Sequence, residues 1–144
     1  MKKLLLIILT FVLACCCLLF GSCKGKKSYE GTYKFKELKV EEDGTEFSFE
    51  IGDKFEGMRL TKDFVTVTIN EEDAIVRIYT YEEEGTEKDE YTEVYVYNWV
   101  IGLNDEVYFF AEGESEVEYI AKKDGNTLTL DVDLHYTMTI VLEK

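Results

Sequence analysis

The segment with the clearest pattern in the chain runs Phe64-Val65-Thr66-Val67-Thr68-Ile69-Asn70. An extended strand would place Val65, Val67 and Ile69 on one face and the two threonines on the other, because successive side chains alternate. Apolar residues with a period of two are typical of a half-buried β-strand, whereas an amphipathic helix repeats them every three to four residues. The segment therefore predicts a strand, which ends where Asn70 begins a polar turn.

Segments on either side share this β-type composition, with valine, isoleucine, threonine and aromatic residues more frequent than alanine and leucine beyond residue 23. The expected strands are residues 32–40, 46–51, 64–70, 74–81, 91–101, 106–111, 116–122, 126–132 and 136–142. A change in the phase of the alternation near Glu37 predicts a β-bulge in the first of them.

Short turn sequences separate these segments, for example Asp43-Gly44, Glu112-Gly113 and Asp124-Gly125. Short connections join neighbouring strands in antiparallel pairs, so the expected fold is all-β, an antiparallel meander of eight to nine strands. Such a meander forms a barrel or, as the alternative, a β-sandwich. We favour the barrel, because the chain contains no proline and a closed barrel tolerates proline least.

The composition of the 144 residues excludes several classes of protein. A formal net charge of −14 argues against binding of nucleic acid, which requires a basic surface, and against adsorption to anionic lipid through surface charge. Hydrophobic residues make up 46% of the chain and aromatic residues 14%, whereas disordered acidic chains are poor in both. The length suits one domain.

The chain begins Met1-Lys2-Lys3, and an apolar run over residues 4–20 follows, which is typical of a helical export signal. The run ends in Phe20-Gly21-Ser22-Cys23, and a lysine-rich segment follows. This ending resembles the lipobox of bacterial lipoproteins, in which an apolar residue and two small residues precede the cysteine. The resemblance implies that residues 1–22 are a cleaved lipoprotein signal peptide and that Cys23 carries a lipid. The protein would then be exported and anchored to a bacterial membrane, with its domain on the extracytoplasmic side.

Two alternatives are open for this segment. Cys15 also follows a lipobox-like sequence, although cleavage there would leave an apolar start instead of a polar one. An uncleaved anchor helix over residues 4–20 would span roughly 25 Å, less than the hydrocarbon core of about 30 Å. With Cys23 as the attachment site, residues 23–29 are the lipidated cysteine and a polar tether, and residues 30–144 are the β-barrel domain.

This domain resembles the small lipocalin-like (calycin-type) domains of bacterial lipoproteins at both of its ends. Gly31-Thr32-Tyr33 is similar to the Gly-x-Trp or Gly-x-Tyr that begins their first strand, and residues 124–130 and 138–144 are similar to their last hairpin. The resemblance implies a lipocalin-like barrel. The basic residue that often packs over the first-strand aromatic ring in that family is not identifiable, because neither Arg59 nor Arg77 lies near the end of the domain.

Five aromatic residues on two neighbouring predicted strands are the candidate ligand-binding residues. They are Tyr79, Tyr81, Tyr95, Tyr97 and Trp99. Rings with polar tips suit a pocket for an amphipathic molecule at the mouth of a barrel. Alternatively, the same rings fill the core or cover the outer face through cross-strand pairs.

Asp131, Asp133 and His135 have the spacing that places potential metal ligands on one side of a strand. They fall where a turn is expected, so we assign them to a solvated hairpin and assign no metal site. The acidic run over residues 82–90 lacks the ordered spacing of a calcium loop. We expect this run to form a charged, mobile loop.

Catalytic motifs do not support an enzyme. The segment after Cys23 contains no cysteine nucleophile, no serine in a Gly-x-Ser-x-Gly context and no glycine-rich phosphate loop. We therefore expect neither enzymatic activity nor a cofactor. The predicted function is that of a membrane-anchored lipoprotein whose barrel binds a small hydrophobic or amphipathic ligand. The alternative is a cell-envelope module with a filled barrel that interacts with a protein or a glycan.

Overall fold

The computed structural model describes residues 25–84, 87–133 and 136–144, and within these residues eleven strands form one sheet. The strands are β1 (Gly31–Glu42), β2 (Thr45–Glu50), β3 (Lys54–Phe55), β4 (Met58–Arg59), β5 (Val65–Ile69), β6 (Asp73–Glu84), β7 (Glu87–Ile101), β8 (Glu106–Ala111), β9 (Val117–Asp124), β10 (Thr127–Asp133) and β11 (Thr137–Glu143). The predicted all-β class is confirmed, and each predicted strand corresponds to an observed one.

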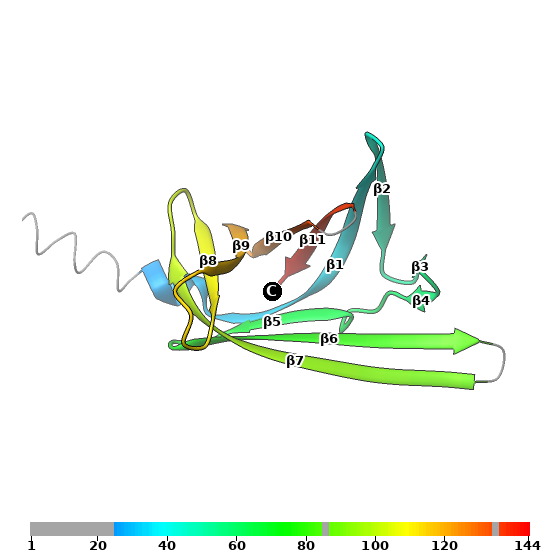
Figure 1. The fold of residues 1–144 in the computed structure, drawn as a ribbon, viewed down its shortest axis with the longest axis horizontal. Coiled ribbons are helices and arrows are strands. Elements are labelled where there is room, and N and C mark those ends of the chain that lie inside the picture. Colours follow the sequence, from blue (N-terminus) through cyan, green and yellow to red (C-terminus); the bar gives the residue numbers. More distant parts are fainter. Residues whose placement is uncertain (1–24, 85–86, 134–135) are drawn as a thin grey trace, which may run out of the picture. The chain divides into compact units, whose positions relative to one another are not determined.

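Eight of the described strands close an antiparallel barrel (Figure 1). Strands β5 to β11 pair in chain order, and β1 completes the ring by pairing with β11 and with β5. This closed ring confirms the predicted barrel and excludes the β-sandwich, in which two separate sheets pack face to face. β2 is a ninth strand outside the ring and pairs with the second half of β1. The architecture is consistent with a lipocalin-like fold.

A bulge in β1 allows this strand to pair with two different neighbours along the same edge. The register of β1 against β11 shifts between Phe35 and Glu37, which confirms the predicted bulge. Residues 31–34 pair with β5 before the shift, and residues 37–42 pair with β2 after it. Because a bulge bends the strand and increases its twist, β1 leaves β5 at this point and continues outward with β2.

The short strands β3 and β4 are not predicted by the sequence, because two residues are too few to show an alternation. They form a small ribbon that pairs with β6 through Met58. Its turn has positive φ at Glu56 (49°) and at Gly57 (82°), as a two-residue hairpin connection of type I′ requires. The ribbon stands next to the part of β6 that β5 does not cover (Figure 1).

The hairpin of β6 and β7 is longer than the sequence predicts. Its strands continue into the acidic run, where residues 82–84 pair with residues 87–89, so the expected loop is wrong for these residues. The side chains of residues 82–89 lie outside the described part of the structure. These acidic residues pair despite their low strand propensity, because this propensity is weak and the context of the two flanking strands outweighs it.

The core fills the end of the barrel at which β1 begins, and we call this end the closed end. Six inward-facing side chains there are almost completely buried, namely Tyr33, Val67, Ile69, Val107, Leu128 and Leu142. Trp99 is buried with them, and its indole Nε1 donates a hydrogen bond of 2.8 Å to the carbonyl oxygen of Asn70. This acceptor avoids the cost of a buried N–H group without a partner.

Residues 25–29 form a short helix, and residues 31–144 form a compact unit of their own. The predicted signal peptide over residues 1–22 and the predicted lipid site Cys23 lie outside the described residues. Within the ranges described, no helix is both long enough and apolar enough to cross a membrane.

Candidate ligand cavity

A cavity of about 370 Å³ occupies the barrel interior beyond the closed end. Its strand walls include Val76, Ile78, Tyr97, Leu130, Val132, Met138 and Ile140. The strand register explains why these side chains meet, because residues that pair directly across two strands point to the same face. Leu130 pairs with Ile140, and Val132 pairs with Met138.

The wall side chains are less buried than the core at the closed end, although they also point inward. Val76, Ile78, Val132, Met138 and Ile140 are each only half-buried. An inward apolar side chain remains partly accessible only where facing side chains do not fill the space between them. The barrel is therefore filled at its closed end and hollow beyond it.

Tyr97 is the centre of an aromatic group on one wall of the cavity. Its ring centre lies 5.7 Å from that of Tyr119 and 6.3 Å from that of Phe109, both in edge arrangements. Its hydroxyl donates a hydrogen bond of 3.4 Å to Oε1 of Glu118. Burial raises the pKa of the Tyr97 phenol, and the nearby Tyr119 and Glu118 raise it further. Tyr97 consequently keeps its proton to a higher pH than an ordinary tyrosine does.

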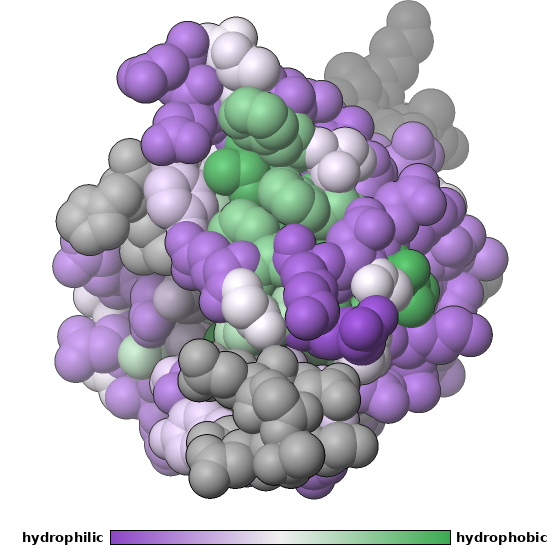
Figure 2. All heavy atoms as spheres, turned by 90° about the vertical axis from the view of Figure 1, so that its right-hand side faces the viewer, coloured by the Kyte–Doolittle hydropathy of each residue, from purple (hydrophilic) through white to green (hydrophobic). Residues whose placement is uncertain are grey.

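The mouth of the cavity is bounded by the β3–β4 ribbon and by Tyr136. The hydroxyl of Tyr136 donates a hydrogen bond of 2.7 Å to Oε1 of Glu56, and its ring centre lies 6.4 Å from that of Phe55. The hydrogen bond to Glu56 raises the pKa of the Tyr136 phenol, with smaller effects of burial and of the charges on Glu56 and Glu42. Figure 2 shows this end of the barrel, where apolar side chains gather within a hydrophilic surround.

The five predicted ligand-binding residues divide into three groups. Tyr95 and Tyr97 line the cavity. Trp99 lies on the same inward face of β7, but at the closed end, where it is part of the core. Tyr79 and Tyr81 lie on the outer face of β6, because the even-numbered positions of that strand point inward and side chains alternate.

Several cavity residues were not among the predicted ones, and only some of them had a signal in the sequence. Val132 and Met138 share the parity of the buried Leu128 and Leu142 on the same hairpin, so the alternation alone identifies them as inward-facing. Phe55 and Glu56 belong to the ribbon that shows no pattern. Their place at the mouth depends on the pairing of β4 with β6.

A second hollow of about 620 Å³ lies where β9 and β10 separate. These strands pair only between residues 121–124 and 127–130. The hollow shares Tyr119 and Val132 with the cavity, so the two spaces are neighbours. Its charged lining residues are Glu106, Glu118, Asp131, Asp133 and Lys122.

An apolar patch lies on the outer face of the barrel across β6 to β9. It consists of Ile75, Val96, Val100, Tyr108 and Ile120, which we call the outer patch. The register places Ile75 beside Val96, and Tyr108 between Val100 and Ile120. Val96 is 52% exposed, and Val100 and Ile120 are each 48% exposed. Exposed apolar side chains that gather on one face mark an interaction site in many soluble proteins.

The carboxylates of Asp131 and Asp133 take part in cross-strand hydrogen bonds between β10 and β11. The hydroxyl of Thr139 donates to Oδ1 of Asp131 at 2.7 Å, and that of Thr137 donates to Oδ1 of Asp133 at 3.1 Å. His135 lies outside the described residues. In the described part of the chain, no group of three or more histidine, cysteine, aspartate or glutamate side chains is placed to hold a metal ion.

Comparisons of the chain with protein-family models, with curated proteins and with solved structures found no match.

Proposed function

We propose that this protein is a non-enzymatic binding protein that holds a small apolar or amphipathic molecule inside its barrel. The observation that carries the proposal is the cavity of about 370 Å³, whose described lining is apolar or aromatic apart from Glu56. Pockets for small molecules are typically about 300–1,000 Å³ and mostly apolar, with a few polar groups that orient the ligand. Tyr97 and the Tyr136–Glu56 pair supply such polar groups here.

The size of the cavity limits the ligand. Its volume lies near the lower end of the range for small-molecule pockets, about 300–1,000 Å³. A single alkyl chain or one small ring system fits this space better than a branched lipid. The aromatic walls also favour a planar or flexible apolar body over a sugar, whose hydroxyls would find few partners.

Binding can be tested on residues 24–144, which contain every strand of the barrel. The neutral probe N-phenyl-1-naphthylamine becomes fluorescent when it enters apolar surroundings. We expect a saturable rise in its fluorescence at one probe per chain, which decreases when a neutral alkyl alcohol is added. A linear rise without saturation would contradict the proposed function, because it would indicate only unspecific adsorption.

We further propose that the barrel is exported and attached to a bacterial membrane through a lipid on Cys23. The support is the sequence Phe20-Gly21-Ser22-Cys23 and the apolar run before it. Cells that express the full chain should incorporate radioactive palmitate into it. The label should disappear in Cys23→Ala and persist in Cys15→Ala, and the opposite result would move the attachment site to Cys15.

A second candidate function, interaction with an envelope protein or glycan, is favoured by the outer patch. Its three exposed aliphatic residues lie on the outer face, where they contribute neither to the core nor to the cavity lining. A photo-crosslinking amino acid at Val96 in living cells should then give a defined adduct, and the same group at Lys36 should not. Lys36 is exposed on β1 and pairs with Glu143 at 3.0 Å, so it serves as a control outside the patch.

A further inference from the structure

We infer that the molecule held in the cavity is a cationic amphiphile, whose positively charged end lies at the mouth beside Glu56. This inference rests on the proposed function and adds to it the charge of the ligand. It follows from the charges that surround the cavity, from the direction of the tyrosine hydroxyls along its wall and from the rings at its mouth.

Glu56 carries the only charge among the described residues that line the cavity. Its Oε1 accepts the hydrogen bond from Tyr136, while a carboxylate has about four lone-pair sites in total. The remaining sites are therefore available to a ligand. Glu56 also sits at the turn of the ribbon, where it is exposed, so a charged ligand end could reach it without losing all of its water.

Three tyrosines around the cavity donate to carboxylates in the same manner. Besides the Tyr136–Glu56 pair, Tyr97 donates to Glu118, and Tyr95 donates a hydrogen bond of 2.6 Å to Oε2 of Glu93. Each hydroxyl that donates to a carboxylate turns its proton away from the ligand and leaves a negative group close to the wall. The charge of Glu42 acts on Tyr136 as well.

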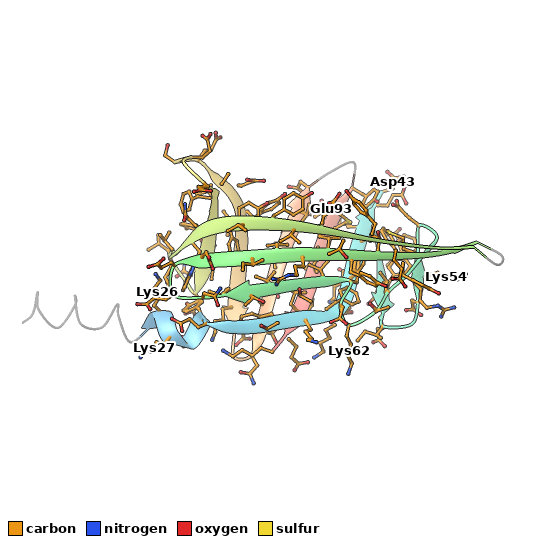
Figure 3. The ribbon with its side chains drawn as sticks, turned by 90° about the horizontal axis from the view of Figure 1, so that it is seen from below. Lys26, Lys27, Asp43, Lys54, Lys62 and Glu93 are labelled. Atoms are coloured by element: carbon orange, nitrogen blue, oxygen red, sulfur yellow. The ribbon has the colours of Figure 1, made fainter. Side chains whose placement is uncertain are left out.

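The basic side chains of the ribbon lie on its other face. Phe55 and Met58 pair with each other and line the cavity. Lys54 and Arg59 are the adjacent pair, so they point to the opposite side, and Nη1 of Arg59 donates to the carbonyl oxygen of Gly52 at 3.2 Å. Figure 3 shows Lys62 directed away from the barrel. An anionic end at the mouth would therefore meet Glu56, and none of the described residues that line the cavity is a base that could compensate its charge.

The aromatic rings at the mouth provide a second attraction for a cation. Phe55 and Tyr136 lie edge to face there, and Phe49 packs against Phe55 at 5.2 Å between ring centres. The faces of such rings attract ammonium groups, most strongly quaternary ones, through the ring quadrupole. The neighbouring hollow between β9 and β10 has the same sign of charge, with four acids and one lysine among its lining residues.

The test uses the full chain in nanodiscs of uncharged phosphatidylcholine. Three probes share one decyl chain with a photoactivatable diazirine at its tip and differ only in the other end: trimethylammonium, hydroxyl or carboxylate. After illumination, mass spectrometry locates the labelled residues, and the half-saturating free probe concentration is measured for each probe. Empty nanodiscs correct for partition into lipid. The variants are Glu56→Gln and, as a matched control at the closed end, Glu72→Gln.

We expect the hydroxyl probe to label cavity residues and the trimethylammonium probe to reach half-saturation at a concentration at least tenfold lower. The carboxylate probe should label least. Glu56→Gln should reduce the advantage of the cation over the alcohol several-fold, and Glu72→Gln should leave that advantage unchanged. Labelling by the alcohol without an advantage for the cation would overturn the inference and leave the proposed function standing. Labelling of the cavity by none of the three probes would overturn both.

Discussion

The side-chain nitrogen of Lys144 lies 5.4 Å from the centre of the Tyr33 ring. Tyr33 is completely buried in the core of the closed end, so the lysine covers the ring from outside. The backbone N–H of Lys144 also donates to the carbonyl oxygen of Asn126 at 2.9 Å, which fixes its position next to the last hairpin. Lys144 is thus a basic residue that lies over the aromatic ring of the first strand. Arg59 and Arg77 alone do not reveal this contact, because the basic residue above the ring is a lysine.

Replacement of Lys144 tests how much this contact stabilises the barrel. We expect Lys144→Ala to lower the free energy of unfolding by about 0.5–1 kcal/mol, as for an exposed cation above an aromatic ring. Lys144→Arg should retain most of the stability, because a guanidinium group also stacks on such rings. Urea unfolding of residues 24–144 measures both. Lys62→Ala, at another exposed lysine, is the control, and an equal loss in that variant would contradict a specific contact.

Trp99→Phe should destabilise the barrel much more strongly. The change removes buried volume at the closed end and leaves the carbonyl oxygen of Asn70 without its indole donor. We expect a loss of about 2–4 kcal/mol from the cavity and the lost hydrogen bond together. The adjacent Val100→Ala, on the outer face of the same strand, should cost less than about 1 kcal/mol. Similar losses in the two variants would contradict the assignment of Trp99 to the core.

The strands and their faces could be predicted because both follow from local alternation. The inward parity of residues 65, 67 and 69 and the bulge near Glu37 are visible in the sequence, and the structure has both. The cavity itself could not be predicted, because it depends on how far the inward side chains fill the barrel. Tyr79 and Tyr81 show where this prediction fails, because their aromatic character does not determine which face of β6 they occupy, and they lie on the outer one.

A bulky residue at Met138 tests whether the cavity is where the ligand binds. Met138→Trp adds volume to an inward position that faces Val132 across the hairpin. We expect it to weaken binding of N-phenyl-1-naphthylamine at least tenfold, while the thermal unfolding midpoint changes little because the added ring fills open space. Val96→Trp adds a ring to the outer patch and should leave binding unchanged. Equal effects of both variants would contradict binding inside the barrel.

A side chain at Gly102 is expected to destabilise the barrel. A Cβ at this position would lie 2.7 Å from Cε2 and 2.8 Å from Cε1 of Tyr108, whose hydroxyl is held by a 2.8 Å hydrogen bond to Oε2 of Glu106. Gly102→Ala should therefore lower the free energy of unfolding by about 1–3 kcal/mol. The cost should shrink in the background of Tyr108→Ala, where the ring is absent, and a double-mutant cycle measures the difference. An unchanged cost would place its cause in the backbone instead.

The buried Tyr97 should make the barrel sensitive to alkaline pH. Burial raises the pKa of its phenol in the folded state, whereas an unfolded tyrosine titrates near pH 10. Above pH ~10 the unfolded chain therefore binds fewer protons than the folded one, and the free energy of unfolding falls as pH rises, by up to about 1.4 kcal/mol per pH unit for this residue. Below pH ~9 the residue contributes no pH dependence.

Tyr97→Phe should make the decline of the free energy of unfolding between pH 10 and 11.5 less steep, although the variant lacks the hydrogen bond to Glu118 at every pH. Urea unfolding across this range measures the pH dependence of the free energy of unfolding in both proteins. An unchanged slope in the variant would assign the alkaline sensitivity to other groups.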